Sequence, residues 1–220
     1  MKKTVGHKHP CQSDPDELRI AIALRTGANI LESTECCCGK FVDRLRLHGV
    51  SCIKNAGRFP RHSAINSILK RSLTRIGLPS VLEHVGLMKD RRRPDGLTLN
   101  PWCRGRSLAW DATVVDTFAE SHYIVSAAIP GSVATDAETN KCWKYNDLLD
   151  NYYFQPVRQL QSKLQVCSVY GKSTSSFFSC LAKKLVDMSG DPRERQWLHQ
   201  HLSLAVVRGN TASILACVQV

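Results

Sequence analysis

The sequence predicts a mixed α/β domain, in which helices pack against a sheet. Hydrophobic residues recur at spacings of three and four over residues 61–76, which is typical of a helix with one buried face. Over residues 107–116 they instead alternate along the chain, as they do in a strand. With 220 residues, of which 43% are hydrophobic, the chain is long enough to bury a sizeable core.

The N-terminal half contains two predicted helices and three predicted strands. A short apolar helix over residues 18–25 stops near Gly27, and the helix over residues 61–76 ends at Gly77. The three strands are expected over residues 81–85, 97–99 and 107–116. This order favours a small sheet that follows and packs against the second helix.

The third strand separates two sets of side chains. One face would carry Leu108, Trp110, Ala112 and Val114, and the other face Ala109, Asp111 and Thr113. Beyond it we expect mainly helix over 121–153 with an interruption at Pro130-Gly131, a strand over 154–160, and helices over 181–188 and 194–207. The predicted core is therefore helix, three strands, helix and strand, followed by closing helices.

Positive charge is concentrated in one third of the chain. The net charge is +11, and residues 40–106 alone carry 15 Lys and Arg side chains against four Asp and Glu. The rest of the chain is neutral. This distribution indicates a polyphosphate partner, DNA or RNA, with a merely solubilising basic surface as the alternative.

Neither a secretory signal nor a membrane span is expected. No apolar run approaches the ~18–20 residues of a span, and no hydrophobic stretch follows the charged N-terminal residues. We therefore expect an intracellular protein, nuclear if it acts on DNA. In that setting the ten cysteines are reduced thiols or metal ligands rather than disulfides.

A cysteine-rich segment has the residue types of a structural zinc site. Cys36-x-Cys38-Gly39 is followed by His48 and Cys52, and three thiolates with one imidazole suit a closed tetrahedral ion. The usual pattern has two residues between the first pair of cysteines, whereas here there is one. Because Cys37 is adjacent, the pattern leaves open which two of the three bind, and a chance cluster of reduced thiols is the alternative.

Two aspartates form a second candidate site. Asp95 opens one predicted strand and Asp111 lies within the next, so both carboxylates would lie close together if they share a face. Two close carboxylates repel, and a divalent cation such as Mg²⁺ relieves that repulsion and can activate water toward a phosphodiester. The alternative is an ordinary Pro-Asp-Gly turn.

A predicted helix adds a basic group to this candidate site. Glu138, Lys141, Lys144 and Tyr145 lie at helical spacings of three and four, so they project to neighbouring positions. A lysine near a metal-bound phosphate can orient water or neutralise developing charge. For Glu138 and Lys141 the alternative is an exposed ion pair on the helix surface.

Taken in order, these segments resemble a known family. The motifs are Cys36-x-Cys38-Gly39 with His48-Gly49-Val50-Ser51-Cys52, Ala56-Gly57-Arg58-x-x-Arg61-His62-x-x-Ile65-Asn66, Arg93-Pro94-Asp95-Gly96, Trp110-Asp111-Ala112-Thr113, Lys141-x-x-Lys144-Tyr145 and Leu202-Ser203…Arg208-Gly209-Asn210. The set is similar to the C-terminal part of reverse-transcriptase-like ORFs of metazoan retroelements, and to the restriction-like endonuclease of site-specific non-LTR retrotransposons. It covers about residues 18–215 and implies a PD-(D/E)xK core preceded by a zinc knuckle.

The resemblance implies a role for each matching residue. Asp95 and Asp111 match the two metal-binding carboxylates, and Glu83 matches a supplementary acidic position. In the commonest version of the fold a lysine lies two residues after the second acid, where this chain has Thr113; Lys141 or Lys144 would replace it. The residues expected to contact DNA are Arg58, Arg61, His62, Arg91, Arg92 and Arg93.

These features predict a Mg²⁺-dependent DNA endonuclease domain derived from a retroelement, with structural Zn²⁺. The expected organisation is a lead-in with a short helix over 1–30, a zinc-knuckle-like segment over 31–56 and the endonuclease domain over 57–220. Two alternatives stay open: a catalytically inactive, zinc-containing nucleic-acid-binding module, and a basic accessory piece that binds RNA or a capsid.

Overall fold

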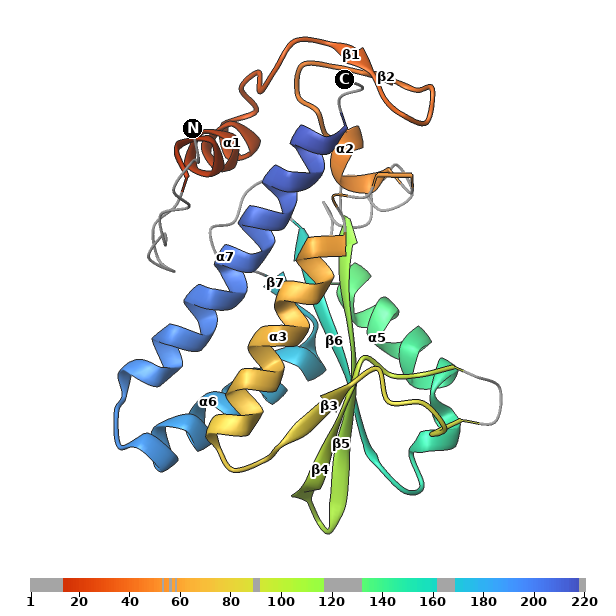
Figure 1. Ribbon diagram of the computed structural model, residues 1–220, viewed down its shortest axis with the longest axis vertical. Helices are drawn as coiled ribbons and strands as arrows, with labels where there is room; N and C mark the ends of the chain where they lie inside the picture. The colour runs from red at the N-terminus through yellow and green to blue at the C-terminus, as the bar shows by residue number, and fades with distance from the viewer. Residues whose placement is uncertain are drawn as a thin grey trace, which may run out of the picture.

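A computed structural model describes residues 14–52, 54–55, 57, 59–88, 92–116, 132–161 and 169–217. The chain is a mixed α/β protein whose centre is a five-stranded sheet (Figure 1). The strands, in their order across the sheet, are β3 (Ser80–Leu82), β4 (Gly96–Cys103), β5 (Arg106–Asp116), β6 (Tyr153–Gln161) and β7 (Val169–Tyr170). β5 and β6 are parallel and the other neighbours are antiparallel, so the sheet is mixed.

Helices cover both faces of this sheet. α3 (Phe59–Arg75), α6 (Lys172–Ser189) and α7 (Arg193–Ala216) pack on one face, and α5 (Ser132–Lys144) packs on the other (Figure 1). Leu108, Trp110 and Ala112 of β5 join the large core under α3, α6 and α7. Ala109 joins a smaller core with Tyr145 and Leu148, the latter in the 3₁₀ turn η2 (Asn146–Leu148) that follows α5. The two predicted faces of this strand are confirmed at these described positions.

The N-terminal elements are small and rest on the end of α7. They are α1 (Pro15–Thr26), the two-stranded hairpin β1 (Thr34–Glu35) and β2 (Phe41–Val42), and α2 (His48–Ser51). Ile214 of α7 is buried with Ile20 of α1 and Val50 of α2. The last turns of the chain's longest helix thus lie beside the cysteine-rich segment (Figure 1).

The predicted order of helix, three strands, helix and strand is present as α3, β3, β4, β5, α5 and β6. The first strand is shorter than predicted, because Glu83 adopts a left-handed backbone with φ of 51° directly after Leu82. The Glu83 N–H still donates to the Asp95 carbonyl at 2.9 Å, which keeps the end of β3 beside the start of β4.

Several other boundaries differ from the prediction. α6 begins at Lys172 and α7 continues to Ala216, so both closing helices are longer than 181–188 and 194–207. The sequence gives no hydrophobic pattern for the Ser- and Thr-rich start of α6, and β1, β2 and β7 were not predicted. Of the predicted helical stretch over 121–153, the part before residue 132, with its Pro-Gly interruption, lies outside the described residues. None of the helices described is long and apolar enough to cross a membrane.

Candidate metal centre and carboxylate site

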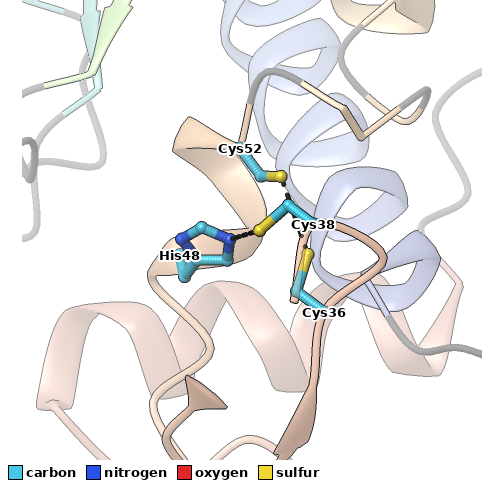
Figure 2. A group of neighbouring side chains, drawn as sticks. All are labelled: Cys36, Cys38, His48 and Cys52. Atoms are coloured by element: carbon cyan, nitrogen blue, oxygen red, sulfur yellow. Dashed lines mark hydrogen bonds between the residues drawn. The ribbon is translucent and has the colours of Figure 1, made fainter. Parts of the chain in front are cut away.

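The hairpin β1–β2 and helix α2 bring four potential metal ligands together. The turn of the hairpin is closed by the Cys36 N–H, which donates to the Lys40 carbonyl at 2.9 Å, and by Gly39 with φ of 86°, a conformation that favours glycine. Cys36 and Cys38 lie in this turn, and His48 and Cys52 lie at the two ends of α2 (Figure 2). The four ligand atoms all lie within 4.8 Å of one another.

The distances in this cluster fit a tetrahedral zinc ion. Bonds of about 2.3 Å to sulfur and 2.0 Å to nitrogen place two sulfurs roughly 3.8 Å apart, and a sulfur and a nitrogen roughly 3.5 Å apart. The Sγ atoms of Cys36 and Cys52 are 3.6 Å apart, and Cys38 Sγ lies 3.2 Å from His48 Nε2. The four residues could therefore hold the ion that the sequence predicts, and the single residue between the first two cysteines is accommodated by the tight turn.

Local electrostatics favour the ligand forms of two of these residues. The backbone of Lys40 lowers the pKa of the Cys38 thiol by hydrogen bonding, which favours the thiolate that binds metal. Burial, and then the charge of Lys40, lower the pKa of His48, which favours the neutral imidazole. Burial raises the pKa of Cys52, so this thiol would lose its proton on metal binding. Cys37 is exposed, and although its Sγ lies 3.8 Å from that of Cys36, it is not one of the four clustered ligands.

The sheet brings the two predicted aspartates to one site. Gly96 of β4 pairs with Trp110 of β5, so Asp95, one residue before Gly96, stands opposite Asp111. Asp95 itself lies just outside the paired strand, and its carboxylate meets His62 of α3, the helix that packs on the face opposite to α5. Asp111 is 5% exposed, and it lies on the face that α5 covers.

Asp95 lies directly before the first residue of β4, beside β5. Its Oδ2 accepts a hydrogen bond from the Ala112 N–H at 2.6 Å and lies 2.8 Å from His62 Nε2 of α3. Burial opposes ionisation of Asp95, but the hydrogen bonds and charge of His62 outweigh it and lower the pKa of the carboxyl. The same hydrogen bond raises the pKa of His62. His62 is therefore part of the carboxylate site rather than only of a DNA-facing helix.

Asp111 is held by two side chains of the α5 segment. Lys141 Nζ donates to its Oδ1 at 2.7 Å, and the Tyr145 hydroxyl donates to its Oδ2 at 2.8 Å. That hydroxyl also lies 3.0 Å from the Arg93 carbonyl, which ties the turn before Asp95 to α5. Burial, and then the hydrogen bond to Asp111, raise the pKa of Tyr145, so it stays a donor. Asp111 therefore has protein partners without a metal, and they come from a segment 30 or more residues further along the chain.

The structure separates the two candidate lysines. Lys141 pairs with Asp111, with 21% of its side chain exposed. Lys144 is exposed, and its Nζ lies 5.2 Å above the Tyr145 ring. Of the two, Lys141 is therefore the basic group of the carboxylate site.

Glu138 and Arg158 form a buried layer beneath the site. The Glu138 carboxylate accepts hydrogen bonds from the Ser173 and Thr174 N–H groups at 3.2 and 2.9 Å, at the start of α6. It is not paired with Lys141 in an exposed ion pair. Arg158 of β6 stands opposite Thr113 and is 3% exposed, and burial lowers its pKa while Asp111 and then Glu138 oppose that effect. The sequence did not single out Arg158, because only strand pairing brings it to Thr113.

The residues predicted to contact DNA have diverse surroundings. Arg61 is 3% exposed, and its Nη1 donates to Asn210 Oδ1 of α7 at 2.7 Å, so its guanidinium joins two helices instead of facing a ligand. Arg92 donates to the Lys144 carbonyl. Arg93 pairs with Glu83 at 3.0 Å, and both of these side chains are more than half exposed. The predictions for Arg58 and Arg91 lie outside the described residues.

Glu83 thus has a partner different from the one the resemblance implies. Its carboxylate meets Arg93 at the surface, and its bond to Asp95 joins the two backbones only, through the Glu83 N–H and the Asp95 carbonyl. Within that part of the chain, the zinc-type cluster is the one group of three or more His, Cys, Asp and Glu ligands in close mutual contact. Comparison with protein-family models gave no match, and a search of curated proteins found no significant relative.

Proposed function

We propose that this chain is a divalent-metal-dependent DNA endonuclease with a PD-(D/E)xK core and a zinc knuckle at its N-terminal side. The observation that carries the proposal is that Asp95, just before β4, stands at the register position opposite Asp111 of β5, and that Lys141 of α5 pairs with Asp111. The order of helix, three strands, helix and strand in residues 59–161 agrees with the core that the resemblance implies. Lys141 supplies from a helix the charge that the commoner arrangement places at position 113.

The donor chemistry of the site suits a hard cation. Asp95 and Asp111 offer carboxylate oxygens, which Mg²⁺ prefers, and they would hold the ion between adjacent strands. Such an ion lowers the pKa of bound water and stabilises charge on a phosphodiester. The residues of the chain would then orient the reactants: Lys141 stands where it can hold a water or a phosphate oxygen, and Tyr145 and His62 fix the two carboxylates.

The charge distribution supports DNA as the partner, in the nucleus if the enzyme acts on a genome. The segment over residues 40–106 carries the whole excess of positive charge, and it includes His48 and Cys52 of the zinc-type cluster and the helix that presents His62. Among its described cations, Lys70, Arg71 and Arg104 are exposed. Neutralisation of phosphates by such side chains supplies affinity without base specificity.

A second candidate is an inactive, zinc-containing nucleic-acid-binding module. It is favoured by one observation: Lys141 and Tyr145 already satisfy the Asp111 carboxylate, so this site is stable as a protein network without a cation. The two candidates share the knuckle and the basic surface and differ only in cleavage.

One experiment separates them, namely nicking of supercoiled plasmid measured beside DNA binding in the same samples. Asp111→Asn should reduce Mg²⁺-dependent nicking by ~10³-fold or more, because the metal loses a charged ligand. DNA affinity should stay level or rise, because a negative charge near the phosphate is removed. Asp187→Asn, at an exposed position on α6, is the matched control and should leave both unchanged. Equal nicking by wild type and Asp111→Asn would reject the nuclease proposal.

A further inference from the structure

A further cysteine lies against the cluster of three cysteines and one histidine. Cys217 directly follows α7, is fully buried, and its Sγ donates a hydrogen bond to Cys36 Sγ across 3.2 Å. It is 165 or more residues away from the other cysteines of the cluster in the sequence, so no local motif indicates it. Cys36, which is also fully buried, is thus in contact with both Cys52 and Cys217.

The approach of α7 to this segment is tight and specific. A Cβ added to Gly49 of α2 would lie 3.2 Å from the Cys217 Cβ and 3.1 Å from the Ser213 carbonyl oxygen. Asn55 Nδ2 donates to the Gly49 and Ser213 carbonyls, each at 2.6 Å. The position of Cys217 beside Cys36 is therefore set by packing and hydrogen bonds, not by a free chain end.

A buried cation completes these surroundings. Arg46 is 4% exposed, and its Nη2 donates to the Glu32 carbonyl, whereas its Nε and Nη1 have no hydrogen-bond partner among the residues that the structure describes. The Arg46 carbonyl accepts a hydrogen bond from the Gly49 N–H at 3.0 Å, so Arg46 lies against α2, whose two ends carry His48 and Cys52. A buried guanidinium with unpaired nitrogens is costly unless an anion lies near it.

We propose that Cys217 and Arg46 form the outer shell of the metal site, in which the Cys217 S–H donates to the metal-bound Cys36 thiolate and Arg46 balances the charge. Zinc with three thiolates and a neutral imidazole has a net charge of −1, which in a buried site calls for a donor and a cation. Cys217 is a positioning residue and not a fifth ligand, because a structural zinc ion takes four. Zinc would thereby fix the end of α7, the helix that packs on α3, to the knuckle. This inference rests on the zinc part of the proposed function.

Zinc affinity of the full chain, measured by competition with a chromophoric chelator, tests the proposal. Cys217→Ala should weaken zinc binding about 10-fold or more, the usual effect of losing an outer-shell partner. Cys217→Ser should recover most of that loss, because a hydroxyl donates the same hydrogen bond. Cys180→Ala, an exposed cysteine on α6, should have no effect. Ile214→Val, which trims the same helix end, serves as the packing control.

Replacing zinc by Co²⁺ tells a ligand from its neighbour, because the intensity of the thiolate-to-cobalt band follows the number of bound thiolates. The band should be equally intense in wild type and Cys217→Ala. A weaker band would make Cys217 a ligand and overturn the outer-shell assignment. Unchanged zinc affinity in Cys217→Ala would also overturn it. So would a loss of affinity that Ile214→Val reproduces and Cys217→Ser does not restore. A wild-type chain that takes up no zinc would overturn the zinc assignment itself and this inference with it.

Discussion

Lys141→Met should reveal how much the Asp111 ion pair contributes to stability. Lys141 Nζ lies 2.7 Å from Asp111 Oδ1, and the Asp111 side chain is only 7% exposed. Removal of one partner of a fully buried pair costs about 3–5 kcal/mol. Here Tyr145 still donates to the carboxylate and Lys141 is one-fifth exposed, so we expect a loss of about 2–3 kcal/mol.

Urea unfolding, with the m-value checked for constancy, measures this loss. Lys144→Met is the matched control, and it should cost less than about 1 kcal/mol because an exposed cation over an aromatic ring contributes little. In an Asp111→Asn background, Lys141→Met should also cost less than about 1 kcal/mol, which gives a coupling free energy of roughly 1–3 kcal/mol. Equal losses for the two lysine variants in the wild-type background would refute the assignment of Lys141 as the partner of Asp111.

Three further predictions concern other contacts. His62→Gln should lower the free energy of unfolding by up to about 1 kcal/mol near pH 5–6. Because the pKa of His62 is raised, its stabilising contribution is complete below the unfolded pKa of 6.5 and is lost as pH rises through the folded pKa. The contribution from the lowered pKa of Asp95 is lost only as pH falls below 3.8. Urea titrations should therefore show a smaller effect of His62→Gln at pH 8.5, and an effect independent of pH would contradict the ion pair. Arg61→Met should cost about 1–3 kcal/mol and leave DNA affinity unchanged, since it unpairs buried Asn210; weaker DNA binding at unchanged stability would contradict this. Chelation of zinc should lower the midpoint of thermal unfolding and its return should restore it, whereas equal midpoints would argue against a bound ion.

The alternation of hydrophobic residues was sufficient to predict which face of the sheet Asp111 lies on, but not which side chains contact it. Strict alternation over residues 107–116 predicts that Asp111 and Ala109 share a face, and the structure shows the same. The pairing of Gly96 with Trp110 then brings Asp95 opposite Asp111. Which lysine joins them depends on the rotation of α5, and the packing of Tyr145 and Leu148 against the sheet decides that. Their spacing in the sequence alone does not distinguish Lys141 from Lys144, because the two lie within one helical turn.

Contacts between distant segments account for what sequence reasoning missed. Arg61 lies four residues before Ile65, on the buried face of its helix, and this spacing was a signal that its side chain is interior. Its partner Asn210, like the pairing of Arg158 with Thr113 and of Cys217 with Cys36, depends on tertiary packing. The hydrophobic periodicity of each segment taken alone does not indicate which residue of a distant segment it will contact.

The most direct test of the central claim is the rate at which the zinc-loaded wild-type chain nicks supercoiled plasmid with and without added Mg²⁺. Mg²⁺ is withheld rather than chelated, so that the Cys36, Cys38, His48 and Cys52 cluster keeps its ion. The proposed nuclease predicts nicking that rises with Mg²⁺ to a plateau and is absent without it. Intact DNA binding with no nicking at any Mg²⁺ concentration would contradict the nuclease and favour the binding module.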